Sequence, residues 1–358
     1  MQRFLKYKAI FIKEIIHISR DIRTLILSLI VPIFFIVIFG YAIKLEVKNI
    51  SVSIVDHEQN NLSREIKNKL NCTGVFKKIY EEYELGEEKF LENKIKAKIY
   101  LKQDLSEELT KKGNSEIILI IDGTDPTMFS TLSGYFIRIF SERENTFDFK
   151  YKVLFNEEMK SEIYIVPGII AIVLAVLSSV LITISITKEY EMQTFQMLLT
   201  LPLKPYEIIL GKVFPYILLG ILQFSLSLLS AKILFNIPFR GNLFFLYLSA
   251  FIYILSGLGI GIIISTSFKK TQTSLLTTWL TTILPSFLLS GFIFPLENIP
   301  QVLKILSYFV PARYFMEILR GILLRGTNIF FLLDELFILT IISSFLIFMA
   351  SKMIKEKI

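Results

Sequence analysis

The sequence is poor in the residues on which several protein classes depend. One cysteine in 358 residues cannot form an intrachain disulfide, so a disulfide-stapled scaffold is excluded. Only 20% of the residues are charged, against roughly 25% in soluble domains, and 53% are hydrophobic. This hydrophobic excess excludes intrinsic disorder, and 16 glycines are far too few for collagen. The composition therefore predicts a membrane protein.

Six apolar stretches are long enough to cross a bilayer, which takes roughly 17–25 residues each. Five or seven spans, or two of the six as buried core helices, are the alternatives. The first stretch is longer than the roughly 7–15 residue apolar region of a cleaved signal peptide, so we expect it to stay as a membrane helix. The six predicted spans are Thr24–Ile43, Ile163–Thr187, Val213–Phe235, Leu243–Thr266, Leu275–Phe294 and Ile329–Ala350.

The net charge of +7 is divided unevenly along the chain. The polar block 44–162 contains 19 basic and 22 acidic residues, a net −3, so the rest carries +10. Fourteen basic residues lie in the N-terminal arm, the loops after the second and fourth spans and the tail 351–358, against five in the opposite loops. By the positive-inside rule, both termini face the cytoplasm and the block faces outward. The basic excess thus indicates orientation rather than a nucleic-acid partner.

Residues 1–23 are predicted to form an amphipathic helix in the cytoplasmic membrane interface. Apolar side chains recur at steps of three and four, while Lys6, Lys13 and Arg20 recur every seven residues on another face. Two interpretations stay open: a generic membrane-proximal helix, and an elbow helix that packs against a partner protein. The apolar positions are Phe4, Tyr7, Phe11, Ile15, Ile18 and Ile22.

The fold class predicted is a polytopic α-helical membrane protein with an extracytoplasmic α/β domain, 44–162, inserted between the first two of six transmembrane helices. In this block, short β-branched runs alternate with helical patterns. Because Gly134 is the one breaker between 126 and 160, we expect a long helix there that leads back to the membrane. Strands are predicted at 51–55, 97–101 and 116–121, and further helices at 62–70, 84–93 and 105–112.

His57 lies between Asp56 and Glu58, which could suggest a metal site or a catalytic triad. No second His or Cys occurs at ligand spacing, and Cys72 stands alone. A solvated turn is therefore the preferred interpretation, and no metal site is predicted.

The loop 188–212 has the pattern of a short helix lying along the membrane, with a charged start, an apolar middle and a proline-bounded turn. A soluble partner could grip and move such a helix. We take the following as candidates for coupling to that partner: Lys188, Glu189, Glu191, Thr194, Leu198, Pro202 and Gly211.

With this loop, the sequence resembles a type-2 ABC exporter permease, the membrane subunit of a bacterial multidrug-type efflux system. The resemblance covers nearly the whole chain in order. Two departures leave the contact geometry of the coupling helix open: Gln193 replaces the usual Gly before Thr194, and Leu201 precedes Pro202. The other matching segments are Lys13-Glu14, Arg20-Asp21, Pro32, Asp122-Gly123-Thr124, Gly134-Tyr135, Phe155-Asn156, Val166-Pro167-Gly168, Ser290–Pro295, Pro300, Pro311–Phe315 and Arg320-Gly321.

The chain lacks a Gly-x-x-x-x-Gly-Lys-Ser/Thr phosphate loop. Its one Gly-Lys pair, Gly211-Lys212, has Tyr206 in place of the first Gly and Val213 in place of Ser/Thr. The resemblance implies that ATP and Mg bind a separate ABC ATPase subunit, and that this chain is not itself an enzyme. It also implies a second permease copy or paralogue, membrane lipid and possible periplasmic adaptor contacts, in a bacterial inner membrane.

Few polar groups lie at depth in the predicted spans, and no Asp, Glu or His is central, which argues against a proton-coupled carrier. Gly257 and Gly261 form a Gly-x-x-x-Gly pair, for which intrachain packing is favoured over a dimer seam. Hydroxyls in spans can line a substrate path or bond carbonyls of their own helix. The path candidates are Ser178, Ser179, Thr183 and Gln223.

Residues 295–328 are too polar to span but contain apolar positions, so an external re-entrant or interfacial segment is predicted. Arg313 and Arg320 can pair with Glu317 or contact lipid phosphates. The candidates for an external gate are Pro295, Pro311, Arg313, Tyr314 and Arg320.

The leading hypothesis is a permease that exports an amphipathic or apolar small molecule, or a lipid-like substrate, with ATP hydrolysed on another subunit. The alternative is a membrane-anchored sensor or assembly scaffold whose external domain binds a partner without transport. A membrane hydrolase is disfavoured because Gly-x-Ser-x-Gly and His-Glu-x-x-His are both lacking.

Overall fold

A computed structural model describes most of the chain and divides it into two compact units. Unit 1 comprises Met1–Ala42 and Ile165–Ile358, and unit 2 comprises Ile43–Tyr164. The residues that the structure describes are 2–42, 50–72, 76–82, 95–107, 115–124, 132, 136, 147–155, 161–194, 205–294, 296 and 299–355.

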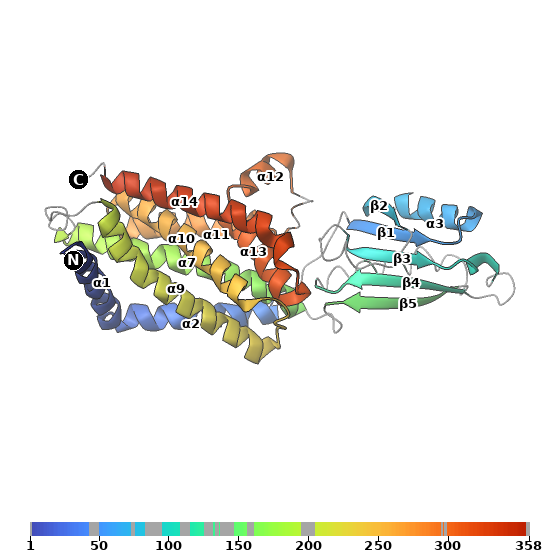
Figure 1. Cartoon of the computed structure of the whole chain (residues 1–358), viewed down its shortest axis with the longest axis horizontal. Coiled ribbons are helices and arrows are strands. Elements are labelled where there is room, and N and C mark those ends of the chain that lie inside the picture. The colour runs from blue at the N-terminus through green and yellow to red at the C-terminus, as the bar shows by residue number, and fades with distance from the viewer. Residues whose placement is uncertain are drawn as a thin grey trace. The chain divides into compact units, whose positions relative to one another are not determined.

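Unit 1 is a helical bundle in which the long helices run side by side (Figure 1). The beginning of α1 and the end of α14 lie at the same end of this bundle, which we call the terminus-bearing end. Helix α1 crosses that end and packs on α9, while α10 packs on α9, α11 and α14. The helices are α1 (Gln2–Arg20), α2 (Ile22–Ala42), α7 (Ser161–Glu191), α9 (Pro205–Phe235), α10 (Leu243–Phe268), α11 (Thr271–Leu288), α12 (Gln301–Ser307), α13 (Pro311–Arg320) and α14 (Leu333–Lys355), with a π-helical turn at Gly321–Arg325 and a 3-10 turn at Ile329–Leu332.

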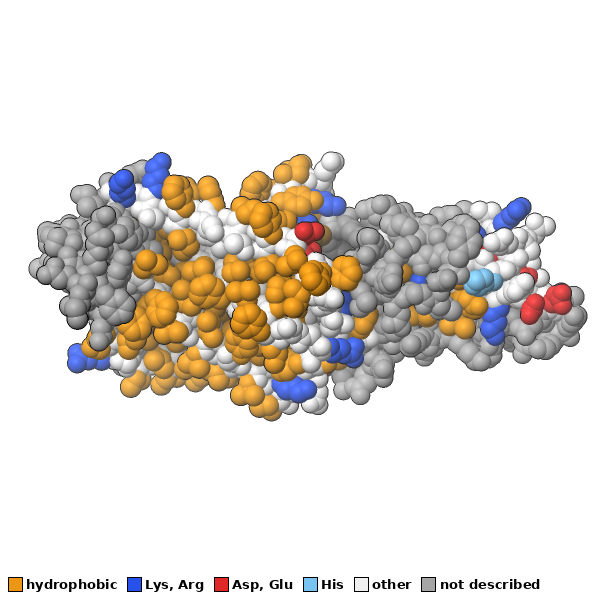
Figure 2. Space-filling model, viewed as in Figure 1, with side chains coloured by type: hydrophobic (Ala, Val, Ile, Leu, Met, Phe, Trp, Pro, Cys, Tyr) orange, Lys and Arg blue, Asp and Glu red, His pale blue; other side chains and the backbone are white. Residues whose placement is uncertain are grey.

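Four helices among the described residues are long and apolar enough to cross a membrane: Glu162–Glu191, Leu210–Phe235, Leu243–Phe268 and Ile329–Lys355. In α2, the apolar stretch Ser28–Gly40 is shorter than the other four. Helix α11 ends at Leu288 rather than at Phe294 and has eight Ser or Thr among its 18 residues, which lowers its hydropathy. Apolar side chains cover the visible face of the bundle (Figure 2), as expected for helices solvated by lipid.

Helix α10 shows how the sequence sets a helix boundary. The side chain of Asn242 accepts a hydrogen bond from the amide of Phe245 at the start of the helix. At the other end, Lys269 has a left-handed backbone with φ of 51°, and its amide bonds the carbonyl of Ser265. The chain then enters α11 after only Lys269 and Lys270, so the two helices form a tight hairpin.

Unit 2 contains a five-stranded sheet of order β2-β1-β3-β4-β5. β1 pairs in parallel with β2 and β3, β3 pairs antiparallel with β4, and β4 pairs in parallel with β5. Side chains of β1, β3 and β4 share one core with α3 and with Leu132 and Phe136. The elements are β1 (Ile50–Asp56), α3 (Asn61–Cys72), β2 (Phe76–Glu82), β3 (Ala97–Leu101), β4 (Ser115–Asp122) and β5 (Phe147–Leu154).

Two strands in unit 2 differ from the sequence-based expectation. The predicted long helix between 126 and 160 is wrong at Phe147–Leu154, which form β5 in register with Ser115–Asp122. The sequence Phe-Asp-Phe-Lys-Tyr-Lys-Val-Leu alternates with the period of two that is typical of a strand, and the lack of Gly or Pro obscured it. Strand β2 was not predicted, while the helix expected at 84–93 lies outside the described residues.

Candidate functional site

Three helices converge at the terminus-bearing end of unit 1, where the loop 188–212 begins and ends. Helix α7 brings in the start of the loop, α9 brings in its end, and α1 packs across them. A Cβ added at Gly211 would lie 2.8 Å from Cβ of Ile10, so glycine is needed for α1 to approach α9 this closely. Gly211 was predicted as a coupling residue, and the structure places it in this helix contact.

A network of four charges, of which all but Lys13 are buried, joins the three helices beside Gly211. Nζ of Lys212 lies 2.8 Å from Oε1 of Glu14 and 2.7 Å from Oε2 of Glu189. Lys13 forms ion pairs with the same two carboxylates, at 3.5 Å to Glu14 and in a short contact with Glu189. Ser185 donates to Oε2 of Glu14 at 3.2 Å. We call Lys13, Glu14, Glu189 and Lys212 the buried ion network.

The buried ion network keeps its carboxylate at Glu14 charged. Burial by itself raises the pKa of Glu14, but the ammonium group of Lys212 and then that of Lys13 outweigh it and lower the pKa below its usual value. For Lys13, burial lowers the pKa, and the hydrogen bond and charge of Glu189 raise it above the ordinary value. Two carboxylates and two ammonium groups therefore balance one another between α1, α7 and α9.

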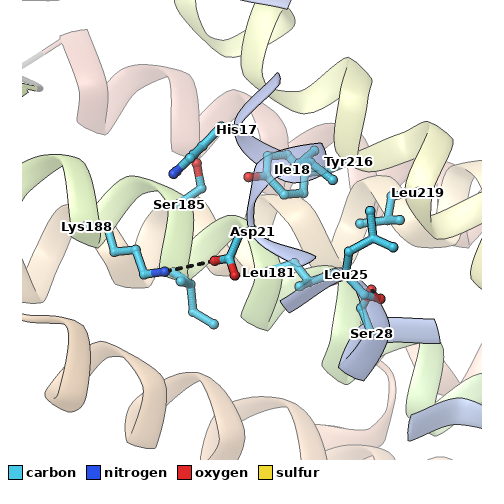
Figure 3. Close-up of a pocket in the computed structure, with 11 residues that line it drawn as sticks. His17, Ile18, Asp21, Leu25, Ser28, Leu181, Ser185, Lys188, Tyr216 and Leu219 are labelled. Atoms are coloured by element: carbon cyan, nitrogen blue, oxygen red, sulfur yellow. Dashed lines mark hydrogen bonds and ion pairs between the residues drawn. The ribbon is translucent and has the colours of Figure 1, made fainter. Parts of the chain in front are cut away.

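A second ion pair lies next to the network. Nζ of Lys188 is 3.2 Å from Oδ2 of Asp21, at the break between α1 and α2, and Figure 3 shows the two side chains pointing toward each other. They border a cavity of about 30 Å³, which has room for about two water molecules and not for a drug-sized ligand. The cavity is lined by His17, Ile18, Asp21, Leu25, Ser28, Leu181, Ile184, Ser185, Lys188, Tyr216 and Leu219.

The remaining coupling candidates divide into two groups. Glu191, the last residue of α7, accepts hydrogen bonds from the amide and the hydroxyl of Thr271, and Thr194 donates to the carbonyl of Glu189 at 3.4 Å. Leu198 and Pro202 lie outside the described residues. Gln193 has a left-handed backbone with φ of 60°, a conformation that glycine adopts more readily than glutamine. The departure from the usual Gly therefore falls at a position whose backbone favours glycine.

The hydroxyl candidates for a substrate path lie in the contact between α7 and its neighbours. Ser178 and Ser179 are buried and donate to the carbonyl of Ala175 within α7. Thr183 reaches across to the hydroxyl of Thr278 on α11 at 3.1 Å and to the carbonyl of Gly261 on α10. The structure thus shows these groups satisfied in helix packing, and their role in a path stays a prediction.

The Gly-x-x-x-Gly pair packs within the chain, as predicted. A Cβ at Gly257 would lie 2.1 Å from the hydroxyl of Ser178, and one at Gly261 would lie 2.4 Å from the carbonyl of Ser179. Both glycines therefore allow α10 to approach α7. Gln223 similarly ties α9 to α2, because its amide donates to the carbonyl of Ser28 at 3.2 Å.

The external-gate candidates are brought together at the other end of unit 1. Of the two alternatives for Arg313, pairing with Glu317 or contact with lipid, the structure shows neither directly: Arg313 lies over the ring of Tyr308, 4.2 Å from its centroid, and Glu317 pairs with Arg325 at 3.1 Å. Nη1 of Arg320 donates to the carbonyl of Gly291 at 3.2 Å. Pro311 begins α13, Tyr314 is buried and donates to the carbonyl of Tyr308, and Pro295 lies outside the described residues.

The turn around His57 is built by its two acidic neighbours. Oδ1 of Asp56 accepts the amides of Glu58 and Gln59, and its Oδ2 pairs with Lys67 at 2.9 Å. Glu58 accepts the amide of Leu105 at 2.8 Å, and the ring of His57 lies against Tyr100. Among the described residues, no group of three or more His, Cys, Asp or Glu could hold a metal ion. Both carboxylates thus organise the backbone, although Asp56 is buried rather than solvated.

We expect acid to weaken this turn through Asp56. Burial raises the pKa of Asp56, but the amide of Gln59 and the ammonium group of Lys67 outweigh it and hold the pKa below the ordinary 3.8. Its contribution is therefore present above about pH 4 and is lost as the pH falls through the folded-state pKa. Asp56→Asn should reduce hydrogen-exchange protection of residues 50–72 about five-fold at pH 7, or ~1 kcal/mol.

Exchange in the full chain, corrected for the intrinsic rate at each pH, checks this expectation. The difference between wild type and Asp56→Asn should shrink at pH 3. A difference that stays constant from pH 7 to pH 3 would assign the effect to shape rather than to charge.

Sequence reasoning missed Glu14 and Lys212 as a pair. Glu14 lies three residues after Phe11 and four before Ile18, so it stands on the predicted apolar stripe, and this was a usable signal. The buried face of α1 in fact contains Ile10 and Glu14, whereas Ile15 is 40% exposed. Lys212 was interpreted as part of the basic cytoplasmic face and in the Gly-Lys pair that fails the phosphate-loop pattern, and no carboxylate partner was predicted for it.

Comparison with known proteins finds a family and relatives that match most of the chain. The sequence profile of the "ABC-2 family transporter protein" family matches residues 22–352. The "Probable multidrug ABC transporter permease YbhS" of Escherichia coli K12 is 27% identical, covering 90% of this chain and 89% of its own length. The "Probable multidrug ABC transporter permease YbhR" of the same strain is 24% identical, over 93% of both chains. The "ABC transporter G family member 20" of Dictyostelium discoideum is 22% identical over 96% of this chain and half of its own length.

Proposed function

The chain belongs to the ABC-2 transporter family, and on that premise we propose that it is the permease subunit of an ATP-driven exporter. The family match and the relatives named as multidrug permeases support an amphipathic or apolar cargo, either a small molecule or a lipid-like one. ATP and Mg are bound and hydrolysed on a separate ABC ATPase subunit.

The ATPase acts on this chain through the segment that follows α7. The observation that carries this proposal is the buried ion network, which anchors Glu189, in the last turn of α7 before the segment, and Lys212, in α9 after it, to α1. A push on the segment is therefore delivered to three helices together. A surface loop without such anchoring would absorb the push by changing its own conformation.

In the membrane arrangement that we propose, α2 and α11 cross the bilayer with the four longer apolar helices, for six spans. Both termini then face the cytoplasm, which agrees with their location at one end of the bundle and with the basic residues of that end. Unit 2, inserted between α2 and α7, is extracytoplasmic.

A second permease, either a copy or a paralogue, packs against the outward side of α11. Hydroxyls lie on both sides of this helix: Ser274, Thr278 and Thr282 are buried, while Thr273 and Thr281 are exposed. The outward side mixes these hydroxyls with exposed Leu276, Trp279 and Leu280, and the hydroxyl of Thr281 donates to the carbonyl of Thr277 in the same helix. Such a mixed surface suits packing against a second permease and contact with an amphipathic cargo. Sequence reasoning placed the path on α7 and α9, and α11 is the addition that the structure supports.

Purification of the tagged chain from its native membranes in mild detergent tests the proposal. We expect an ABC ATPase to copurify in stoichiometric amount. We also expect inside-out vesicles that contain the complex to accumulate ethidium when ATP is added and not when a non-hydrolysable analogue is added. If the chain is recovered without an ATPase and ethidium accumulation does not depend on ATP, the scaffold alternative is favoured.

A further inference from the structure

Glu191 joins the end of α7 to the beginning of α11, two positions that are 80 residues apart. Its Oε1 accepts the amide of Thr271 at 2.8 Å, and its Oε2 accepts the hydroxyl of Thr271 at the same distance. The carboxylate therefore uses both oxygens on a single residue, the first of α11.

This contact supplies α11 with a cap that its own sequence lacks. The first amides of a helix have no partner within the helix, and an Asp, Asn, Ser or Thr at the preceding position usually accepts one of them. That position is Lys270 in this chain, and its side chain makes no such bond. A carboxylate also interacts favourably with the positive end of the helix dipole. Glu191 thus caps α11 from another helix.

The last turn of α7, from which the coupling segment begins, is consequently held on two sides. Glu189 binds Lys13 on α1 and Lys212 on α9, and two residues later Glu191 binds α11. The two anchors differ in burial, because Glu189 is buried and Glu191 is exposed. An exposed carboxylate loses little hydration when it binds and regains it when released, so the contact at Thr271 can form and break during a transport cycle at low cost.

We propose that Glu191 is a positioning residue that transmits movement of the coupling segment to α11, and so to the hydroxyl-bearing face of that helix. The inference rests on the proposed function, since it needs an ATPase that moves the segment. It assigns to Glu191 a partner within this chain, Thr271, in place of the direct ATPase contact expected from the sequence.

The test follows α11 directly and needs no knowledge of the substrate. Cys72 is the only cysteine of the chain, so Cys72→Ser with Thr281→Cys leaves one thiol on the exposed face of α11. In the purified permease–ATPase complex, we measure the rate at which a maleimide labels this thiol, with and without ATP and vanadate. We expect nucleotide to change the rate at least three-fold when Glu191 is present and less than 1.5-fold in Glu191→Ala.

Helix capping and transmission are separated by a second variant. Lys270→Ser in the Glu191→Ala background returns a cap to α11 without returning the link to α7. We expect its labelling rate to remain insensitive to nucleotide. A recovered response would overturn the proposal, because the role of Glu191 would then be structural. Thr271→Val removes only the hydroxyl and should give an intermediate response, while Gln272→Ala, exposed in the same turn, should behave like the parent.

A covalent bridge gives the rescue. Glu191→Cys with Thr271→Cys, joined by a short bis-thiosulfonate, should keep the two helices together. A fluorescent unnatural amino acid at position 281 then reports on α11, and its signal should respond to nucleotide again. If α11 responds to nucleotide in Glu191→Ala as it does in the parent, the inference fails while the proposed function stands. If the parent itself shows no response to nucleotide, the proposed function fails with it.

Discussion

Lys212→Met is expected to lower the thermal midpoint of the full chain in detergent by roughly 10 °C. Lys212 is 1% exposed and lies between the carboxylates of Glu14 and Glu189, which are 0% and 7% exposed. Removing the central ammonium group leaves two buried negative charges, which among the described residues still form an ion pair with Lys13. Breaking a buried ion pair in this way costs about 3–5 kcal/mol, and for a bundle of this size each kcal/mol shifts the midpoint by about 2–4 °C.

A neutral version of the network is the control. Glu14→Gln, Lys212→Met and Glu189→Gln together remove the three buried charges of the network and leave Lys13, which is 47% exposed, so they should recover most of the lost stability. Size-exclusion chromatography of heated samples, followed by tryptophan fluorescence, measures the midpoints. A midpoint of Lys212→Met within 1 °C of wild type would mean that water reaches these charges and that the network does not hold the three helices together.

Gly261→Ala is expected to destabilise the chain by about 2 kcal/mol, within the range of overpacked cores. Its new methyl group would lie 2.4 Å from the backbone carbonyl of Ser179 and 2.4 Å from a methyl group of Ile182. A backbone atom cannot move aside as the end of a side chain can, so α7 and α10 must separate. The contact between Thr183 and the carbonyl of Gly261 should weaken as a consequence.

Gly220→Ala is the matched control for this substitution. Its Cβ would meet only the side chain of Ile254, at 3.0 Å or more, and that side chain can adjust. Thermal midpoints of the two variants in the same detergent compare the sites. If helix propensity alone decided the outcome, both alanine variants would be more stable than wild type, by up to about 1 kcal/mol. An increase for Gly261→Ala would therefore contradict the close α7–α10 contact.

The strands of unit 2 show where pattern reading succeeds and where it stops. Ala97–Leu101 and Ser115–Asp122 are apolar and β-branched, and both were predicted within a residue of their observed bounds. Phe147–Leu154 alternates polar with apolar residues but has no turn signal nearby, so a continuous helix was the simpler interpretation. What decides it is the parallel partner β4, which is far away in sequence.

The candidate site shows the same difference between what the sequence pattern predicts and what tertiary contacts decide. Glu189 and Glu191 were selected as coupling candidates from the order of residues around them, and that role stays a prediction. Their partners were not predicted, because Lys13 and Lys212 lie 176 and 23 positions from Glu189, and Thr271 lies 80 positions from Glu191. The basic residues of these stretches were explained by membrane orientation, and Glu14 on the apolar stripe signalled burial without indicating which cation would pair with it.

The sequence by itself determined the class of the protein, because apolar composition and span length follow from burial in lipid and need no tertiary contact. It also determined the family, through the ordered segments that the profile matches between residues 22 and 352. Only the tertiary structure decided that Glu14 and Lys212 balance each other and that Glu191 caps α11. The physical reason is that a buried charge or an uncapped helix end is satisfied by whichever group lies nearest in space, and helix packing, not chain order, brings that group there.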